Sequence, residues 1–570
     1  MSFKLPRKDG HQDLASANFD LLMPVTLNET SIERMLIQFL ERCVKHGHTS
    51  QPRKASEFSE ETGELNLKRN LVPKLQTSSN FANFDSSLGA NLLEGWIRTS
   101  LLEMIPLGRK KSSQEQIDFL KLLNVANYRA GLPTSNSRAR HRRVDNSMYR
   151  VLLQFLGTQG AEKPMDEIHH AVTQTSLAKG VDFPILERYW PEPKYDEVTE
   201  VDINTLLELR FVELFKSSGT TRSRTDADVQ SPLALPIMEP FSDLASDFYA
   251  ATKSYGDMSS LELMQMYSSI FAIRLYQLPI RVGQSLIDLM KIAPESLTEI
   301  KSCQPADMFF DFTNDPNSAA TSLSNACVGR DLRTLSSFFD TSILLRETER
   351  CVKAVKQKSE EYEKLMPAEK LIYLFQNIDS PEISMVAGLR LDHFATIFVE
   401  NPEELEVLNS VKQETSNFLR ALVELVLMDR RTDGLEGIRK WLKAVGGLRQ
   451  QGSQDSASIV KGSNKPNLWV YSMSDGVLNT LLHMCFLSES GRRIGRDSLE
   501  MQEILSRLHS RFGVLIKSPP VGFNSAEFHK AADENFVAFT KRLKQLGWFE
   551  GLSDDFDAQH VTRPKGTQDD

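Results

Sequence analysis

The densest group of cationic side chains in the sequence lies between residues 138 and 143. Four arginines surround His141 there: Arg138, Arg140, Arg142 and Arg143. The flanking Ser, Asn and Gly residues predict an exposed loop. Guanidinium groups stay charged and can bind two oxygens of one phosphate, so we predict that this loop contacts DNA or RNA. The alternative is a solubilising loop, or one that pairs with carboxylates of the same chain.

A second group of cations lies on the polar side of a predicted helix that begins at Ser525. Its members are Lys530, Lys541, Arg542 and Lys544. Of these, Lys541 and Lys544 are predicted to contact nucleic acid. Apolar residues recur along this segment every three or four positions, which is the period of an amphipathic helix.

The segments around this helix predict a winged helix. Two helices precede it, and two short strands of a hairpin are expected over 548–552 and 559–562. The last helix of such a fold can enter the major groove of DNA while the wing touches phosphates. The expected wing is acidic, with Asp554, Asp555 and Asp557, which favours docking to a protein over direct reading of DNA.

Carboxylates are concentrated in a third segment, where Asp307, Asp311 and Asp315 alternate with phenylalanines. A two-metal nuclease needs clustered carboxylates, usually with a lysine close by, and no lysine follows here in a strand context. Helix capping by Asp and Asn is therefore the preferred interpretation. A metal-dependent nuclease with dispersed carboxylates remains an alternative, with Asp307, Asp311 and Glu349 as the first residues to test.

The remaining motifs predict neither a metal site nor a cofactor. Cys43-x-x-His46-x-His48 supplies soft ligands, but a zinc site needs a fourth, and no second cluster of matching spacing exists. The sequence contains no Walker A motif, no GxGxxG after a strand and no GxSxG elbow. No catalytic residue can be assigned. The five cysteines are scattered without a CxxC pair, and Cys351 and Cys485 are expected to be buried thiols.

Composition limits the classes of function. The chain has 570 residues, of which 25% are charged, and 67 Lys and Arg face 76 Asp and Glu, for a net charge of −9. Such a chain is no polycation, so a contact with nucleic acid must come from a local basic patch. The longest apolar run, 421–428, is far shorter than the roughly 20 residues of a membrane span. No secretion signal is recognised, and we expect a cytoplasmic protein.

The hydrophobic periodicity predicts a mainly α-helical protein. Helices are expected from Ser31 to Val44 with Asn28 or Thr30 as cap, from Leu92 to Pro106, from Ser112 to Leu123, and from Tyr149 to Leu156. The chain is predicted to begin with a helical N-terminal region that includes the basic loop (1–216), followed by a linker (217–232) and a central helical domain (233–449). A second linker (450–466), the winged-helix-like domain (467–564) and a tail (565–570) complete it.

Three segments give the chain a resemblance to a known group of proteins. They are SRARHRR, FFDFTNDPNSAATSLSNACVGRDL and LGWFEGLSDDFDAQHVTRP. The chain resembles the large accessory proteins of bacterial anti-phage defence systems, of the methylation-associated or phosphorothioation-dependent type. The resemblance implies a helper subunit that works with a methyltransferase, ATPase or nuclease, and it transfers no catalytic residue.

The sequence therefore predicts a non-enzymatic helical subunit of a multi-protein complex. Its body would bind other proteins and its basic loop would bind DNA or RNA, with no membrane contact. The alternatives are the metal-dependent nuclease and a transcription regulator that uses the winged helix.

Overall fold

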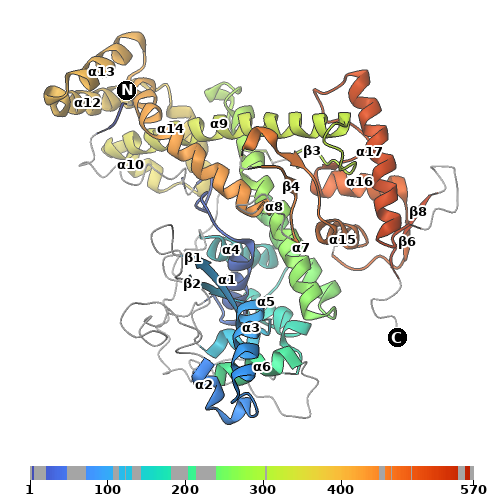
Figure 1. The fold of residues 1–570 in the computed structure, drawn as a ribbon. Helices are drawn as coiled ribbons and strands as arrows, with labels where there is room; N and C mark the ends of the chain where they lie inside the picture. Colours follow the sequence, from blue (N-terminus) through green and yellow to red (C-terminus); the bar gives the residue numbers. More distant parts are fainter. Residues whose placement is uncertain are drawn as a thin grey trace.

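The computed structural model describes most of the chain, and every structural statement below concerns the residues that it describes. These are residues 3–5, 19, 21–47, 72–106, 115–121, 123–130, 143–180, 203–213, 239–301, 305–448, 456–463, 465–488, 491–549 and 559–564. Helices dominate them (Figure 1), which confirms the prediction of a mainly α protein.

Four long helices form the centre of the molecule. They are α7 (Glu239–Tyr255), α8 (Ser260–Leu289), α9 (Ala319–Ala354) and α14 (Phe418–Val445). Helix α8 packs against both α7 and α9, and α14 packs against α9 and α8. Ser259 and Glu262 start α8 with a capping box, which satisfies two backbone donors that would otherwise lack partners. The buried indole of Trp441 on α14 donates to the carbonyl oxygen of Leu275 on α8 at 3.2 Å.

Four shorter helices project from one end of this centre, at the upper left of Figure 1. They are α10 (Lys356–Glu363), α11 (Pro367–Asn377), α12 (Pro381–Ile397) and α13 (Pro402–Glu414). Three of them begin with proline at the first helical position, where the missing N–H costs no hydrogen bond. The prolines therefore fix where one helix ends and the next begins.

Six N-terminal helices precede α7 in the described part of the chain. They are α1 (Ile32–Val44), α2 (Val72–Gln76), α3 (Ser87–Trp96), α4 (Val144–Thr158), α5 (Pro164–Thr173) and α6 (Ile203–Glu213). Three of them, α1, α4 and α5, pack on α7 or α8. Helix α1 contacts α4, α5 and α8. The cap of α1 is Ser31, whose Oγ accepts from the Arg34 N–H at 3.5 Å, and not Asn28 or Thr30 as the sequence predicted.

The helix predicted after Ser112 is wrong. Residues Glu115–Leu120 form strand β2, which pairs antiparallel with β1 (Leu102–Pro106). The helix predicted up to Pro106 likewise ends before β1. Over 116–119, polar and apolar residues alternate with the period of a strand, and pairing with β1 outweighs the capping-box pattern.

The C-terminal elements follow the predicted order of helices. The short strand β5 (Val470–Tyr471) precedes α15 (Asp475–Cys485), and β6 (Ser498–Glu500) precedes α16 (Met501–Phe512). Then come β7 (Val514–Leu515), α17 (Ala526–Gln545) and β8 (His560–Thr562). Ser474 caps α15, and Ser525, the predicted first residue of the last helix, is the N-cap of α17.

The C-terminal elements share a core with the central helices. Helix α15 packs on α8, and α17 packs on α9. Strand β7 pairs in parallel with β3 (Met308–Phe309), which lies just before α9. Within the second expected linker, Ile459 is buried and β4 (Val460–Lys461) pairs with β5. The first expected linker lies outside the described residues, and the division into domains stays a prediction.

Candidate functional site

The arginine loop ends at the start of α4. Arg138, Arg140 and Arg142 lie outside the described residues. Arg143 is exposed and left-handed, with a φ of 66°, and it occupies the N-cap position of α4. The start of α4 is anchored to α1, because the buried Asp145 in the first turn of α4 accepts a hydrogen bond from Nε of Arg42 on α1 at 2.6 Å.

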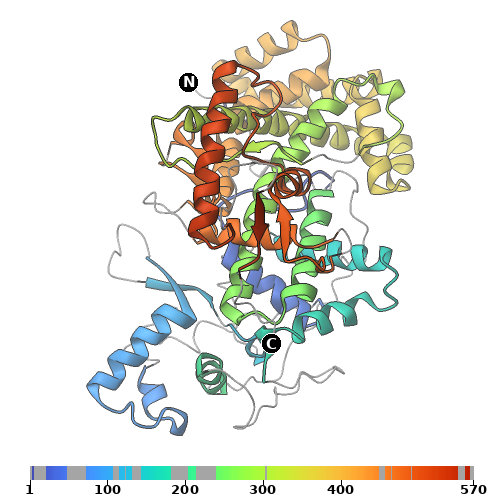
Figure 2. The ribbon, with the colours of Figure 1, turned by 90° about the vertical axis from the view of Figure 1, so that its right-hand side faces the viewer.

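Helix α17 presents its two predicted contact residues on an exposed face. Lys541 and Lys544 are exposed, and the neighbouring Val537 is 67% exposed. The opposite face is held by the buried Asn535, whose side chain donates to the carbonyl oxygens of Phe310 at 2.8 Å and Ile516 at 3.1 Å. Figure 2 shows α17 at the edge of the molecule.

The strand pairing in this region differs from the predicted hairpin. Strand β8 pairs antiparallel with β6, which lies between α15 and α16. The Thr562 N–H also donates to the carbonyl oxygen of the buried Trp548 at 2.8 Å. The sequence missed β6 because three residues directly before a helix are too few to show an alternating pattern. Residues 550–558, with the acidic part of the expected wing, lie outside the described residues.

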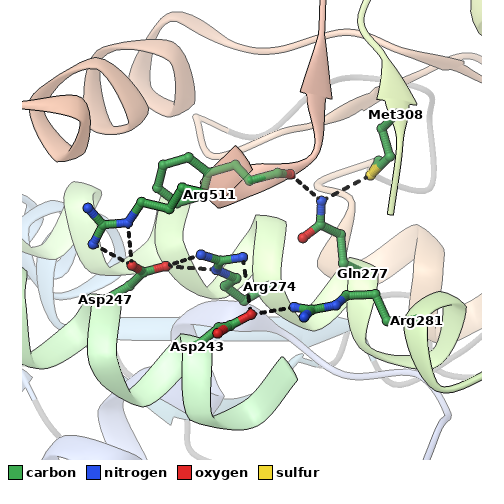
Figure 3. Close-up of polar contacts among 8 residues, drawn as sticks. Asp243, Asp247, Arg274, Gln277, Arg281, Met308 and Arg511 are labelled. Atoms are coloured by element: carbon green, nitrogen blue, oxygen red, sulfur yellow. Dashed lines mark hydrogen bonds and ion pairs between the residues drawn. The ribbon is translucent and has the colours of Figure 1, made fainter. Parts of the chain in front are cut away.

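A buried network of charged side chains connects α16 to the centre of the molecule (Figure 3). The carboxylate of Asp247 on α7 accepts from the guanidinium groups of Arg274 on α8, at 2.6 Å, and Arg511 on α16, at 2.6 Å. Burial alone would raise the pKa of Asp247. The two guanidinium groups outweigh burial and hold the pKa below its usual value.

The same network continues along α8. Arg281 donates to Asp243 at 2.5 Å, and the Gln277 side-chain amide donates to the carbonyl oxygen of Phe512 at 2.6 Å. Sequence reasoning missed this network. The signal was the presence of Arg274 and Arg281 seven residues apart in the mostly apolar stretch 270–282, a spacing that places both on one face of the helix. A buried arginine requires a carboxylate partner.

The carboxylates considered for metal chemistry have internal partners and do not converge. Asp311 accepts from the Thr313 N–H at 2.8 Å and from the Thr321 hydroxyl at 2.5 Å. Asp307 pairs with His509 at 2.9 Å, and Glu349 accepts from the Tyr362 hydroxyl at 2.9 Å.

The distance between these carboxylates follows from the length of α9. The Arg330 guanidinium donates to the carbonyl oxygen of Asp307, so Asp307 lies beside the middle of the helix. Glu349 is roughly five turns further along. The described part of the chain contains no group of three or more His, Cys, Asp or Glu residues that could hold a metal ion.

The Cys43 and His46 pair is also explained by packing. The ring of His46 packs edge-on against His169, with centroids 4.7 Å apart, and burial raises the pKa of the Cys43 thiol well above its usual value. His48 lies outside the described residues. Cys351 and Cys485 are free thiols and buried, as predicted.

Comparison with known proteins decides the family. The family model for methylation-associated defense system protein MAD7 matches residues 12–564. The chain belongs to the MAD7 family. This membership confirms the resemblance found in the sequence, and it makes the chain a protein of a bacterial anti-phage defence system. No curated protein and no solved structure matches the chain. For this MAD7 family member, no described helix has the length and apolar composition needed to cross a membrane.

Proposed function

We propose that this chain is a non-enzymatic subunit of the defence complex that contacts nucleic acid. Two basic surfaces would make the contact: the arginine loop and the exposed face of α17. The observation that carries the proposal is a pair of buried contacts, one at the start of α4, where the arginine loop ends, and one on α17. The buried Arg42–Asp145 pair fixes the end of the loop at α4, and the buried Asn535 fixes α17. Cations carried by a rigid helix, as Lys541 and Lys544 are on α17, lose less conformational entropy when they bind phosphate.

The C-terminal region is proposed to act as a winged helix. Its order is α15, β6, α16, β7, α17 and β8; β6 pairs with β8, while the two-residue strand β7 pairs outside this region with β3. A winged helix has this order of helices, and its third helix is the one that can enter a major groove. Here the third helix is α17, with Lys541 and Lys544 on its solvent side.

A non-enzymatic role is supported by the hydrogen bonds and ion pairs that the candidate carboxylates form with other residues of the chain. Both oxygens of Asp311 accept hydrogen bonds from neighbouring backbone and hydroxyl groups. Asp307 and Glu349 also have internal partners and are separated by much of the length of α9. These contacts suit helix capping and packing.

The nucleic-acid proposal is tested by binding to a labelled DNA duplex and a labelled RNA duplex at several salt concentrations. Replacing Arg140, Arg142 and Arg143 with Ala should weaken binding by about tenfold or more and reduce its dependence on salt. Lys541→Ala combined with Lys544→Ala tests α17 in the same way. The matched control removes Lys291 and Arg420, which are exposed elsewhere on the surface. Unchanged, salt-sensitive binding by both basic variants would contradict the proposal.

The complex proposal has a separate test. The tagged chain is produced together with the other genes of its defence system, and the mass of the purified species is measured by light scattering. We expect an assembly that contains the chain and at least one other system protein. Elution of the chain by itself, with all other system proteins in separate fractions, would argue against a subunit role.

A further inference from the structure

A groove of about 910 Å³ has the chemistry of a ligand site. It lies where α4, α5 and α7 meet the turn that carries Arg492 and Arg493. The Ser254 hydroxyl on α7 donates to the carbonyl oxygen of Gly491 at 2.7 Å. This bond fixes the turn against α7.

Gly491 allows the close approach of this turn. Its φ is 75°, a conformation that side chains disfavour, and a Cβ there would lie 2.9 Å from the Cβ of Ala250. The absence of a side chain therefore lets the turn lie directly on α7. The two arginines that follow form one wall of the groove as a result.

The groove has an excess of positive charge. Lys253, Arg492 and Arg493 line it, against Asp257 as the lining carboxylate. Asp257 is paired with Arg493 at 3.4 Å. Arg492 is exposed, and no described carboxylate forms an ion pair with its guanidinium group. Lys253 pairs at 3.0 Å with Glu167, and this contact is partly exposed to water. An anion in the groove would therefore be attracted by Arg492 and by Lys253, whose charge is shared with Glu167.

The facing wall of the groove is aromatic. Phe155 on α4 and Tyr249 on α7 both line it and pack edge to face, with ring centroids 6.3 Å apart. The Tyr249 hydroxyl donates to Glu167 at 2.5 Å, which fixes the orientation of the ring. Aromatic side chains beside cations are the combination that binds a base together with its phosphate.

We propose that this groove binds a nucleotide unit, with the phosphate at Lys253 and Arg492 and the base against Phe155 and Tyr249. The volume suits a ligand of this size. The unit can come from a free mononucleotide or from a single strand of nucleic acid, since both present a phosphate and a base. The residues that line the groove include none of the arginine loop and none of α17, so the site extends the proposed function.

The experiment measures the binding of two probes to the full-length protein. The first is a fluorescein-labelled oligothymidylate of ten nucleotides, whose binding is measured by fluorescence anisotropy. The second is AMP, which is added as a competitor and is also titrated directly by calorimetry. Lys253→Ala combined with Arg492→Ala should weaken binding by about tenfold. Phe155→Leu keeps an apolar side chain in the partly buried position and should weaken binding by about fivefold.

The matched control is Lys291→Ala combined with Arg420→Ala, which removes the same charges from exposed positions elsewhere. Its affinity for both probes should equal that of the unsubstituted protein. Competition by AMP would identify a free nucleotide as the source, whereas binding of the oligonucleotide without AMP competition would identify a strand.

Two results would overturn the inference: no binding of either probe to the unsubstituted protein, or equal binding by the groove variants. The variant that lacks Arg140, Arg142 and Arg143 separates this inference from the proposed function. If that variant loses duplex binding while the groove variants bind every probe normally, the proposed function stands and the nucleotide groove is wrong.

Discussion

Arg511 donates from Nη2 to Oδ1 of Asp247 at 2.6 Å, across 264 residues of sequence. The carboxylate is buried and also accepts from Arg274, so one aspartate joins α7 to the next helix, α8, and to α16, which is far away in the chain. Arg511 lies on α16, between the other two helices of the proposed winged helix. The position of that region on the helical body therefore depends on this ion pair.

Asp247→Asn should destabilise the protein by about 3–5 kcal/mol, because it removes the close charged partner of the buried Arg274 and leaves that guanidinium only the 3.8 Å contact with Asp243. The measurement is the free energy of unfolding from chemical denaturation. Asp288→Asn is the matched control, since Asp288 pairs with Lys291 in an exposed contact that contributes at most about 1 kcal/mol. Equal effects of the two substitutions would mean that the Asp247 network adds no more than a surface ion pair.

Asp311→Ala should lower the free energy of unfolding by about 1–3 kcal/mol and leave nucleic-acid binding intact. The carboxylate accepts from the backbone N–H and hydroxyl of Thr313 and from the hydroxyl of Thr321, and these donors would lose their partner. Asp315→Ala serves as a control at an exposed position. A variant of normal stability that has lost metal-dependent cleavage of DNA would instead favour the nuclease alternative.

Two helical glycines should respond in opposite directions to alanine. At Gly434 on α14 a Cβ would collide with the ring of Phe339 on α9, so Gly434→Ala should cost about 1–3 kcal/mol. At Gly329 on α9 the nearest heavy atom is the end of Arg333 at 3.8 Å, so Gly329→Ala should stabilise by about 0.5–1 kcal/mol. Thermal unfolding of both variants measures the difference. A rise in Tm for Gly434→Ala would show that α9 and α14 pack less closely than described.

The helices of this protein could be predicted where their signal is local. Ser474 and Ser525 precede apolar residues at helical spacing, and both cap helices in the structure. The strand at Glu115–Leu120 could not, because its stability comes from β1 and the local capping-box pattern suggested a helix. Local signals find elements that stabilise themselves, whereas a strand requires its partner.

The candidate site shows the same division. Lys541 and Lys544 could be placed on a polar helix face from periodicity, and α17 exposes both. The groove at Lys253 and Arg492 could not be predicted, because its walls come from segments more than 200 residues apart. Burial of Asp247 with Arg511 has the same cause. Contacts between segments that are far apart in the chain produce no regular spacing of residues that could be recognised in the sequence.

His483 on α15 should make the stability of the protein depend on pH between about 4 and 6.5. Its ring lies between Tyr255 and Trp548, with centroids 5.2 and 4.9 Å away. Burial lowers the pKa of His483 to about 4, and the positive charges of Arg563 and Arg493 add to this effect. The unfolded chain, with an ordinary histidine pKa of about 6.5, takes up the proton first as the pH falls.

The stabilisation by neutral His483 is therefore complete above pH 6.5 and is lost as the pH falls toward 4. At pH 5 the loss should be about 2 kcal/mol relative to pH 7.5. His483→Phe keeps an aromatic ring between Tyr255 and Trp548 but removes the titrating group. The free energy of unfolding of this variant should therefore fall by about 2 kcal/mol less over that range than that of the unsubstituted protein. Other titrating groups are common to both proteins and cancel in the difference. Parallel curves of stability against pH for the two proteins would show that His483 keeps an ordinary pKa in the folded state.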